Sequence, residues 1–223
     1  MRSPTKLEFS DKYDQAHAKK YFLKHQLGFA RKLSHWRDEQ LARQALAMVG
    51  DPALVLDLPC GAGRFWPLLA ETAGRVIIGA DNSAAMVQTA CTMQPPEVVA
   101  RVRPLQTSAF AIDLPADSVD CIFSMRLLHH IGDAPHRAEL LKEFHRVTRD
   151  SVIVSLWVDG NFKAWKRRRS ERDRGQQGYQ NRFVQPAAVV EAEFLNAGFE
   201  IQEKLDFLPL YAMWRVYVLR KKA

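Results

Sequence analysis

Apolar residues follow two alternating spacings along this chain, and each spacing predicts a different kind of element. Short runs rich in branched side chains are typical of buried strands, whereas apolar residues that recur every three or four positions are typical of helices. The short runs predict strands at Leu54–Leu58, Arg75–Ala80, Val99–Leu105, Cys121–Met125 and Ser151–Trp157. The periodic stretches between them predict helices at Arg64–Ala73, Ala84–Met93 and Pro135–Arg149.

The two ends of the chain extend this pattern. Helical periodicity covers Asp14–Met48, and Gly28 marks a break between two helices. A further helix is predicted at Pro186–Ala197. Two apolar runs then follow with no helix between them, so we expect Phe199–Phe207 and Met213–Arg220 to pair as antiparallel strands.

Five strands that alternate with helices, followed by a closing antiparallel pair, indicate the fold class. We predict an α/β protein with a doubly wound, mostly parallel, Rossmann-like sheet of seven strands, with N-terminal helices and a C-terminal antiparallel strand. At 223 residues the chain fits a single domain, 1–223. Its expected parts are an N-terminal helical cap (1–50), a core that binds a cofactor (51–158), a basic insert or lid (159–185) and a C-terminal helix and hairpin (186–223).

The turn after the first predicted strand carries the clearest chemistry. Asp57 ends the apolar run, Gly61 and Gly63 follow in a turn that opens a helix, and Asp81 ends the second strand. This order of strand, glycine turn, helix, strand and acid is typical of a nucleotide-binding βαβ unit, in which the second acid accepts hydrogen bonds from ribose hydroxyls. An acid ahead of the turn would repel a pyrophosphate, so the pattern favours a ligand with a cationic amino-acid portion.

At these residues the chain resembles the class I S-adenosylmethionine-dependent methyltransferases, whose first motif reads acid-x-Gly-x-Gly-x-Gly, with Pro59 in place of the first glycine. The resemblance covers about residues 50–158, and Gly79–Met86 is similar to the family's second motif. Ser108 stands where the family often has an acid that reads adenine. The resemblance implies S-adenosyl-L-methionine as the cofactor, bound by Asp57, Pro59, Gly61, Gly63, Asp81, Asn82, Met86, Ser108, Ala109 and Met125.

His129 and His130 follow the fourth predicted strand, at the edge where α/β sheets place their ligands. A histidine there could take a proton from an acceptor, so both are candidate catalytic residues. The other interpretation is that one caps the next helix and the other packs inward. Arg126 could hold an acidic acceptor or a cofactor carboxylate, or could be a solvated side chain. Tyr13 and Arg37 are candidates for the cofactor's methionyl end or a lid, or for ordinary packing.

Positive charge is concentrated in one segment. Residues 161–182 contain eight basic and two acidic residues, a net charge of +6 within a chain whose net charge is +7. Arg167, Arg168 and Arg169 are candidates for binding an anionic acceptor, because arginine clusters suit phosphate and carboxylate groups. A solvated helix face is the alternative. The aromatic residues of this segment that could wall a pocket or touch a lipid head-group layer are Phe162, Trp165 and Tyr179.

Composition and motifs exclude several classes of protein. With 47% hydrophobic and 26% charged residues the chain reads as an ordinary globular protein, and no apolar run approaches the ~20 residues of a membrane span. The N-terminus lacks the apolar core of a secretory signal, and the three cysteines have no metal-like spacing. We therefore expect a cytoplasmic protein with reduced thiols and no metal. Ser124–Leu127 also lacks the Pro-Pro-aromatic turn of nucleobase amino-methyltransferases.

Together these features predict an enzyme that transfers a methyl group from S-adenosylmethionine to a small or amphiphilic, anionic acceptor of lipid or saccharide type, with oxygen favoured over nitrogen. Peripheral contact with a membrane surface fits the basic segment, whereas neither nucleic acid nor an obligate protein partner is expected. Two alternatives stay open. One is an RNA or protein methyltransferase that docks through the basic segment. The other is a catalytically silent methyltransferase fold that activates a partner.

Overall fold

The computed structural model describes residues 29–174 and 181–222. Seven strands in these ranges form one sheet. The strands are β1 (Leu54–Asp57), β2 (Val76–Asp81), β3 (Val102–Gln106), β4 (Val119–Ser124), β5 (Thr148–Trp157), β6 (Phe199–Asp206) and β7 (Trp214–Lys221). Their spatial order is β3-β2-β1-β4-β5-β7-β6. Strands β1 to β5 pair in parallel, and β7 runs antiparallel to both β5 and β6. The predicted fold class is confirmed.

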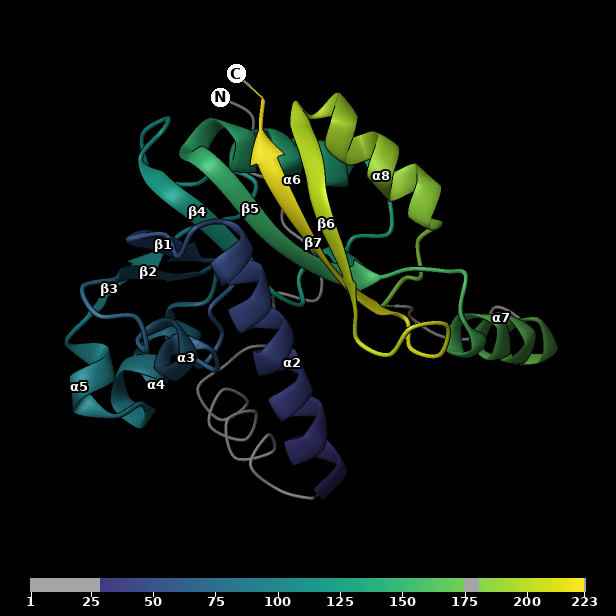
Figure 1. Cartoon of the computed structure of the whole chain (residues 1–223), viewed down its shortest axis with the longest axis horizontal. Coiled ribbons are helices and arrows are strands. Elements are labelled where there is room, and N and C mark those ends of the chain that lie inside the picture. The colour runs from purple at the N-terminus through teal and green to yellow at the C-terminus, as the bar shows by residue number, and fades with distance from the viewer. Residues whose placement is uncertain (1–28, 175–180, 223) are drawn as a thin grey trace.

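Helices flank the sheet, and several of them connect its parallel strands (Figure 1). They are α2 (Phe29–Met48), α3 (Trp66–Leu69), α4 (Ala84–Met93), α5 (Pro96–Val99), α6 (Ala134–Val147), α7 (Phe162–Arg174), α8 (Ala187–Asn196) and the 3₁₀ turn η2 (Leu128–His130). Side chains of α6 and α8 share an apolar cluster with Leu56 and Ile122, whereas side chains of α2, α3 and α4 share a second cluster with Val55 and Cys121. Neighbouring strand residues thus enter opposite layers, which explains the continuous apolar runs.

The helix after the glycine turn is shorter than its sequence predicts. The periodicity predicts Arg64–Ala73, whereas α3 has four residues. The guanidinium of Arg75 donates a hydrogen bond to the carbonyl of Leu69 (3.2 Å), and that of Arg101 donates to the carbonyl of Ala70. These donors come from outside the helix and satisfy carbonyls at its end, so the chain can leave the helix after about one turn.

Three other boundaries test the apolar pattern. Val99, predicted to begin the third strand, is instead the last residue of α5, and β3 begins at Val102. Pro96 explains the difference, because proline favours the first turn of a helix. Helix α4 has its predicted bounds. Helix α2 is described from Phe29 onward, so the break expected at Gly28 and the helix predicted before it lie outside the described residues.

Candidate functional site

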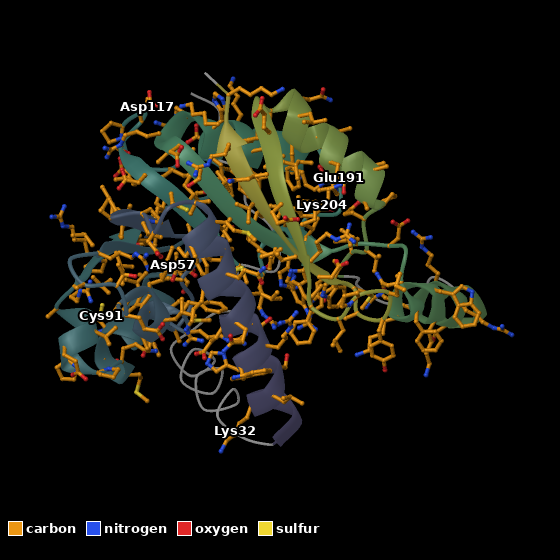
Figure 2. The ribbon with its side chains drawn as sticks, in the orientation of Figure 1. Lys32, Asp57, Cys91, Asp117, Glu191 and Lys204 are labelled. Atoms are coloured by element: carbon orange, nitrogen blue, oxygen red, sulfur yellow. The ribbon has the colours of Figure 1, made fainter. Side chains whose placement is uncertain are left out.

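Four parallel strands bring functional side chains to one edge of the sheet. The carboxyl ends of β1, β2, β4 and β5 share this edge, and their last residues are Asp57, Asp81, Ser124 and Trp157. Open α/β sheets bind their ligands at such an edge. Figure 2 shows Asp57 well inside the outline of the molecule. The site described below is built from this edge and from the turns that follow each strand.

The turn after β1 leaves space for a ligand at one glycine and not at the other. Pro59 enters the turn through a cis peptide bond, and Gly61 and Gly63 both have left-handed backbones, with φ of +54° and +72°. A Cβ atom on Gly63 would lie 2.9 Å from the Trp66 ring, so packing requires glycine there. A Cβ atom on Gly61 would meet no atom within 4 Å. The backbone of Gly61 is therefore open to the approach of a ligand.

Asp57 is a buried acid without a hydrogen-bond partner. It is 1% exposed, and neither carboxylate oxygen makes a hydrogen bond of standard geometry within the described part of the chain. Burial raises the pKa of Asp57 well above its ordinary value, the nearby Asp81 carboxylate raises it further, and the Trp66 indole opposes the rise. A buried, unpaired carboxylate is costly, and a cationic ligand group would offset that cost. Asp57 therefore fits the cationic methionyl portion of S-adenosylmethionine.

Asp81 connects the turn after β1 to the start of α4. Its Oδ2 accepts a hydrogen bond from the backbone N–H of Gly61 (3.0 Å), and its Oδ1 accepts one from that of Ser83 (2.9 Å). Burial raises the pKa of Asp81, whereas these backbone donors lower it. Each carboxylate oxygen has a further lone pair, so Asp81 can also accept hydrogen bonds from ribose hydroxyls.

The other residues predicted to bind the cofactor follow β2, β3 and β4 at the same edge. Asn82 is exposed, Met86 is buried in the first turn of α4, and Ala109 and Met125 are buried after β3 and β4. The Ser108 hydroxyl accepts a hydrogen bond from the backbone N–H of Phe110 (3.2 Å), so it also stabilises its own loop. The ligand contacts of these residues stay predictions.

The two histidines differ in their surroundings. His129 is 4% exposed, and its pKa is lowered to about 2, chiefly by burial and also by His130, Arg182 and Arg126. Burial also lowers the pKa of His130, whose Nδ1–H donates a hydrogen bond to the carbonyl of Asn181 (2.5 Å). A histidine with a very low pKa binds a proton weakly, so His129 is a poor general base.

His129 forms one wall of an aromatic cluster at the ends of β5 and β7. Its ring centroid lies 5.2 Å from that of Trp157 and 4.7 Å from that of Trp214. The Arg126 guanidinium lies over the Trp214 ring, 4.5 Å from its centroid. Three buried polar atoms of this cluster have no hydrogen-bond partner among the described residues: His129 Nδ1, Trp157 Nε1 and Arg126 Nε. Buried polar atoms are usually hydrogen-bonded, so this cluster is a second candidate ligand site.

Asp38 of α2 links the two parts of the site. Its Oδ2 accepts hydrogen bonds from Arg64 Nη2 (2.7 Å), directly after the glycine turn, and from Arg126 Nη2. Two guanidinium groups share one buried carboxylate, which leaves an excess of positive charge. Sequence reasoning missed Asp38. It precedes the buried Leu41 and Ala42 by three and four residues, so an acid on the apolar face of the helix was the available signal.

Arg37 has a structural role in the described contacts. Its guanidinium donates hydrogen bonds to the carbonyls of Phe207 (2.9 Å) and Asp206 (3.2 Å), and so joins α2 to the end of β6. This contact supports the packing interpretation of Arg37 over a cofactor role. Tyr13, the other candidate from the N-terminal region, lies outside the described residues.

The three consecutive arginines of α7 have different environments. Arg167 lies over the Trp157 ring, 5.1 Å from its centroid, and donates a hydrogen bond to the carbonyl of Arg182. Arg168 pairs with Asp159 (2.8 Å). Arg169 lies 5.9 Å from the centroid of the exposed Trp165. Arg167 alone of the three contacts the aromatic cluster in the described interactions, and a role of the three in binding an acceptor stays a prediction.

Thiol, metal and membrane chemistry can also be checked in the described part of the chain. Cys60, Cys91 and Cys121 are free. Burial raises the pKa of Cys60 well above its ordinary value and that of Cys121 to about 12, so both thiols stay protonated at neutral pH. Residues 29–174 and 181–222 contain no group of three acidic, histidine or cysteine side chains placed to hold a metal ion. None of the helices in these ranges is long and apolar enough to span a membrane.

Comparison with known proteins gives one family match. The family model described as a methyltransferase domain matches residues 55–151. A trans-aconitate 2-methyltransferase of Azoarcus sp. is 32% identical over 124 residues, which cover 54% of this chain and 46% of that protein. A tRNA U34 carboxymethyltransferase of Shewanella frigidimarina is 31% identical over 117 residues, which cover 49% of this chain and 33% of that protein. The chain therefore spans less than half the length of either relative.

A solved structure extends the likeness to the whole fold. Magnesium protoporphyrin IX methyltransferase of Synechocystis, crystallised with SAH, superposes with a TM-score of 0.76 at 15% identity, over 96% of this chain and 98% of that one. The parallel sheet, the glycine turn and the two acids at the ends of β1 and β2 define a Rossmann-like domain that can hold a nucleoside-containing cofactor. Residues 55–151 thus match a methyltransferase domain, and the chain resembles the class I S-adenosylmethionine-dependent methyltransferases in this segment and in its fold.

Proposed function

We propose that this chain transfers a methyl group from S-adenosylmethionine to an oxygen atom of a small or amphiphilic, anionic acceptor. The observation that carries the proposal is that two sets of buried polar groups, each with atoms that lack a hydrogen-bond partner among the described residues, lie along one edge of the sheet. Asp57 offers an unpaired carboxylate after β1, and Arg126 lies beside unpartnered ring nitrogens near the ends of β4 and β5. The first set suits a cationic cofactor and the second suits an anionic acceptor.

In this proposal the cofactor-binding residues contact different parts of S-adenosylmethionine. The Asp57 carboxylate holds the cationic methionyl end, and Asp81 accepts hydrogen bonds from the ribose. Gly61 leaves the space through which the cofactor's chain approaches the turn. When bound, S-adenosylmethionine supplies a methyl group activated by its positively charged sulfur. Asn82 or Met86 flanks the adenine, Gly63 keeps the turn packed against Trp66, and the other residues assigned to the cofactor site are Pro59, Ser108, Ala109 and Met125.

The acceptor binds against the aromatic cluster, where Arg126 contacts its anionic group. Arg167, which lies over Trp157, adds a second cation next to this cluster. An oxygen that has already lost its proton, such as that of a carboxylate, needs no general base. This choice agrees with His129, whose pKa of about 2 makes it a weak base. If the acceptor is a hydroxyl, His130 is the better placed of the two to take its proton, because it is less buried.

We propose further that the whole chain works as one methyltransferase domain. Helix α2 caps the sheet edge, because Asp38 binds arginines from the turns after β1 and β4. The segment that contains α7 serves as an insert beside the acceptor. Each of these roles rests on the contacts given above and on the match of residues 55–151 to a methyltransferase domain.

The proposal is tested with S-adenosylmethionine labelled in its methyl group and with separated extract fractions. We expect label in the anionic small-molecule or lipid fraction, and we expect alkali to release it as methanol if a carboxylate was esterified. Alkali-stable label in the same fraction would indicate an ether or an N-methyl group. The Asp57→Asn variant is the control, because it should transfer much less label.

RNA methylation is the second candidate, because one relative acts on tRNA and because α7 is basic. Label in the RNA pool, or in the protein pool, would favour that alternative over the small-molecule acceptor. Tight binding of S-adenosylhomocysteine with no transfer to any pool would indicate a catalytically silent fold. The same assay therefore separates the three functions.

A further inference from the structure

Helix α7 and the loop between β6 and β7 form a surface with many exposed apolar side chains. The two segments lie together at one end of the molecule (Figure 1). This α7 surface contains five of the nine exposed large apolar side chains of the described residues: Phe162, Trp165, Leu208, Leu210 and Tyr211. Single exposed apolar side chains are common, whereas a contiguous group marks a surface that contacts another molecule.

The aromatic rings of the α7 surface are held in fixed positions. The Phe162 ring stacks on that of Tyr211, with centroids 5.8 Å apart and planes 11° apart, and it lies 5.9 Å from the Trp165 ring. The backbone N–H groups of Phe162 and Lys163 donate hydrogen bonds to the carbonyls of Leu210 and Tyr211 (2.9 and 3.0 Å). The helix and the loop are thus joined, so the rings are presented without a large loss of side-chain entropy on binding.

Leu210 is the most exposed apolar residue of this surface. Its side chain is 82% exposed, and its backbone has a left-handed φ of +60°. This conformation favours glycine or asparagine and is uncommon for leucine. An apolar side chain at such a position gains nothing from the packing of the fold itself. A molecule that covers the loop would bury it.

Basic side chains surround these apolar residues. Lys163, Lys166 and Arg169 are exposed on α7. Lys163 Nζ lies 5.1 Å from the centroid of the Tyr211 ring, and Arg169 lies over the ring of Trp165. A face that combines aromatic and aliphatic side chains with cations complements the surface of an anionic bilayer. The apolar groups enter the boundary between head groups and acyl chains, and the cations remain at the head groups.

We infer that the α7 surface docks this protein on an anionic phospholipid bilayer. A bilayer accounts for the observations better than RNA does, because the aliphatic Leu208 and Leu210 offer no stacking surface for a base. Helix α7 follows β5 closely, so docking would bring the sheet edge with the aromatic cluster near the membrane surface. The inference does not depend on the proposed methyl transfer, because the binding surface lies outside the cofactor and acceptor residues.

The test measures how the full-length chain partitions onto sedimented vesicles of phosphatidylcholine alone or mixed with phosphatidylglycerol. We expect binding to the anionic vesicles that weakens with added salt. Changing Lys166 and Arg169 to glutamine together should lower that binding about 30-fold, since each basic residue near an anionic surface contributes about a factor of five. The pair Trp165→Ala and Leu210→Asn should lower it at least about tenfold. Asparagine suits the backbone of Leu210, so this variant should fold.

Matched controls come from exposed residues elsewhere on the chain. Leu195→Asn removes a comparably exposed apolar side chain of α8, and the pair Arg103→Gln and Lys142→Gln removes two exposed cations. Both control variants should bind the anionic vesicles as the wild type does. Thermal unfolding followed by circular dichroism establishes that every variant is folded.

Three results would overturn the inference. The first is sedimentation of the wild type equally with neutral and anionic vesicles, or with neither. The second is a loss of binding in the control variants as large as that in the α7 variants. The third is binding of a single-stranded RNA probe that requires the cations and not Leu210, with no binding to vesicles; the surface would then be a nucleic-acid site.

Discussion

The two halves of the sheet edge carry groups of opposite character. The half formed by β1 and β2 presents carboxylates, Asp57 without a partner and Asp81 bound to the backbone. The half formed by β4, β5 and β7 presents the Arg126 guanidinium and the rings of Trp157 and Trp214. The first half suits a cation and the second suits an anion. A ligand pair of opposite charge can therefore bind side by side along one edge.

The two halves also differ in how the sequence builds them. The acidic half consists of strand ends and a glycine turn that follow one another in the chain. The basic half is assembled from residues on several elements that tertiary packing brings together. Asp38 joins the halves, since it binds the arginine after the glycine turn and the arginine after β4. The predictions below test each half and this junction.

The largest expected effect is on cofactor binding through the acidic half. Gly61→Val should abolish detectable binding of S-adenosylhomocysteine, measured by titration calorimetry, because the new side chain fills the open space beside the turn. Gly74→Val is the matched control, since Gly74 also has a positive φ and open space around it. Both variants should lose a similar ~1–2 kcal/mol of stability from backbone strain. Equal loss of binding in both variants would contradict a ligand role for Gly61.

Asp38, which joins the two halves, should have a large effect on the free energy of unfolding. Asp38→Asn should lower the free energy of unfolding by about 3–5 kcal/mol, because it leaves two partly buried guanidinium groups without their carboxylate. Glu71→Gln, which removes the exposed partner of Arg43, should cost about 1 kcal/mol or less. Denaturant unfolding compares the two variants. Equal costs would mean that Asp38 is not a buried ionic junction.

Asp57→Asn should change the stability of the fold and its affinity for the cofactor in opposite directions. The pKa of Asp57 is raised in the folded chain, so the folded chain retains a proton that the unfolded chain releases above about pH 4. The stability of the wild type without cofactor should therefore fall as the pH rises from there through the folded-state pKa. The variant cannot ionise, so its melting temperature should fall less and should exceed that of the wild type at neutral pH.

The same Asp57→Asn variant should bind S-adenosylhomocysteine about 10- to 150-fold more weakly, because it loses one charge-assisted contact. Asp113→Asn changes an exposed acid and should alter neither the melting temperature nor the affinity. A destabilised Asp57→Asn protein with unchanged affinity would contradict the role proposed for this acid.

The basic half should affect the acceptor and leave the cofactor unaffected. Arg126→Gln should raise the acceptor's KM by about tenfold or more, since a charge-assisted contact is lost. The affinity for S-adenosylhomocysteine should stay near that of the wild type. Arg168→Gln serves as the comparison, because Arg168 pairs with Asp159 and makes no described contact with the aromatic cluster, so its loss should change the KM little. A parallel loss in both variants would mean that the arginines act only through overall charge.

The smallest effect is expected at the thiol in the glycine turn. Cys60→Ser should leave turnover unchanged, because burial raises the pKa of this thiol and keeps it protonated. Stability should fall only slightly, as a hydroxyl replaces a buried thiol. Complete loss of turnover in the folded variant would require a thiol-based mechanism.

Local patterns in the sequence were sufficient to predict the strands, most of the helices and the acidic half of the site. Branched apolar runs predict β1, β2 and β4 to within a few residues, because strands buried on both faces need continuous apolar sequence. Asp57, Gly61, Gly63 and Asp81 could be placed from their spacing, since the ends of consecutive parallel strands must meet at one edge. The charge in residues 161–182 located the basic segment, but a helix there was only one of the alternatives, and the structure shows it as α7.

Tertiary structure decided the features that depend on residues far apart in the chain. Asp38 meets Arg64 and Arg126 across separations of 26 and 88 residues, and no local pattern encodes such a contact. Arg101 helps to end α3 from 31 residues away. The low pKa of His129 arises from burial against rings of β5 and β7, which its own sequence neighbours do not reveal. Sequence determines which groups are available along the chain, whereas packing sets their burial and partners, and these two quantities govern their chemistry.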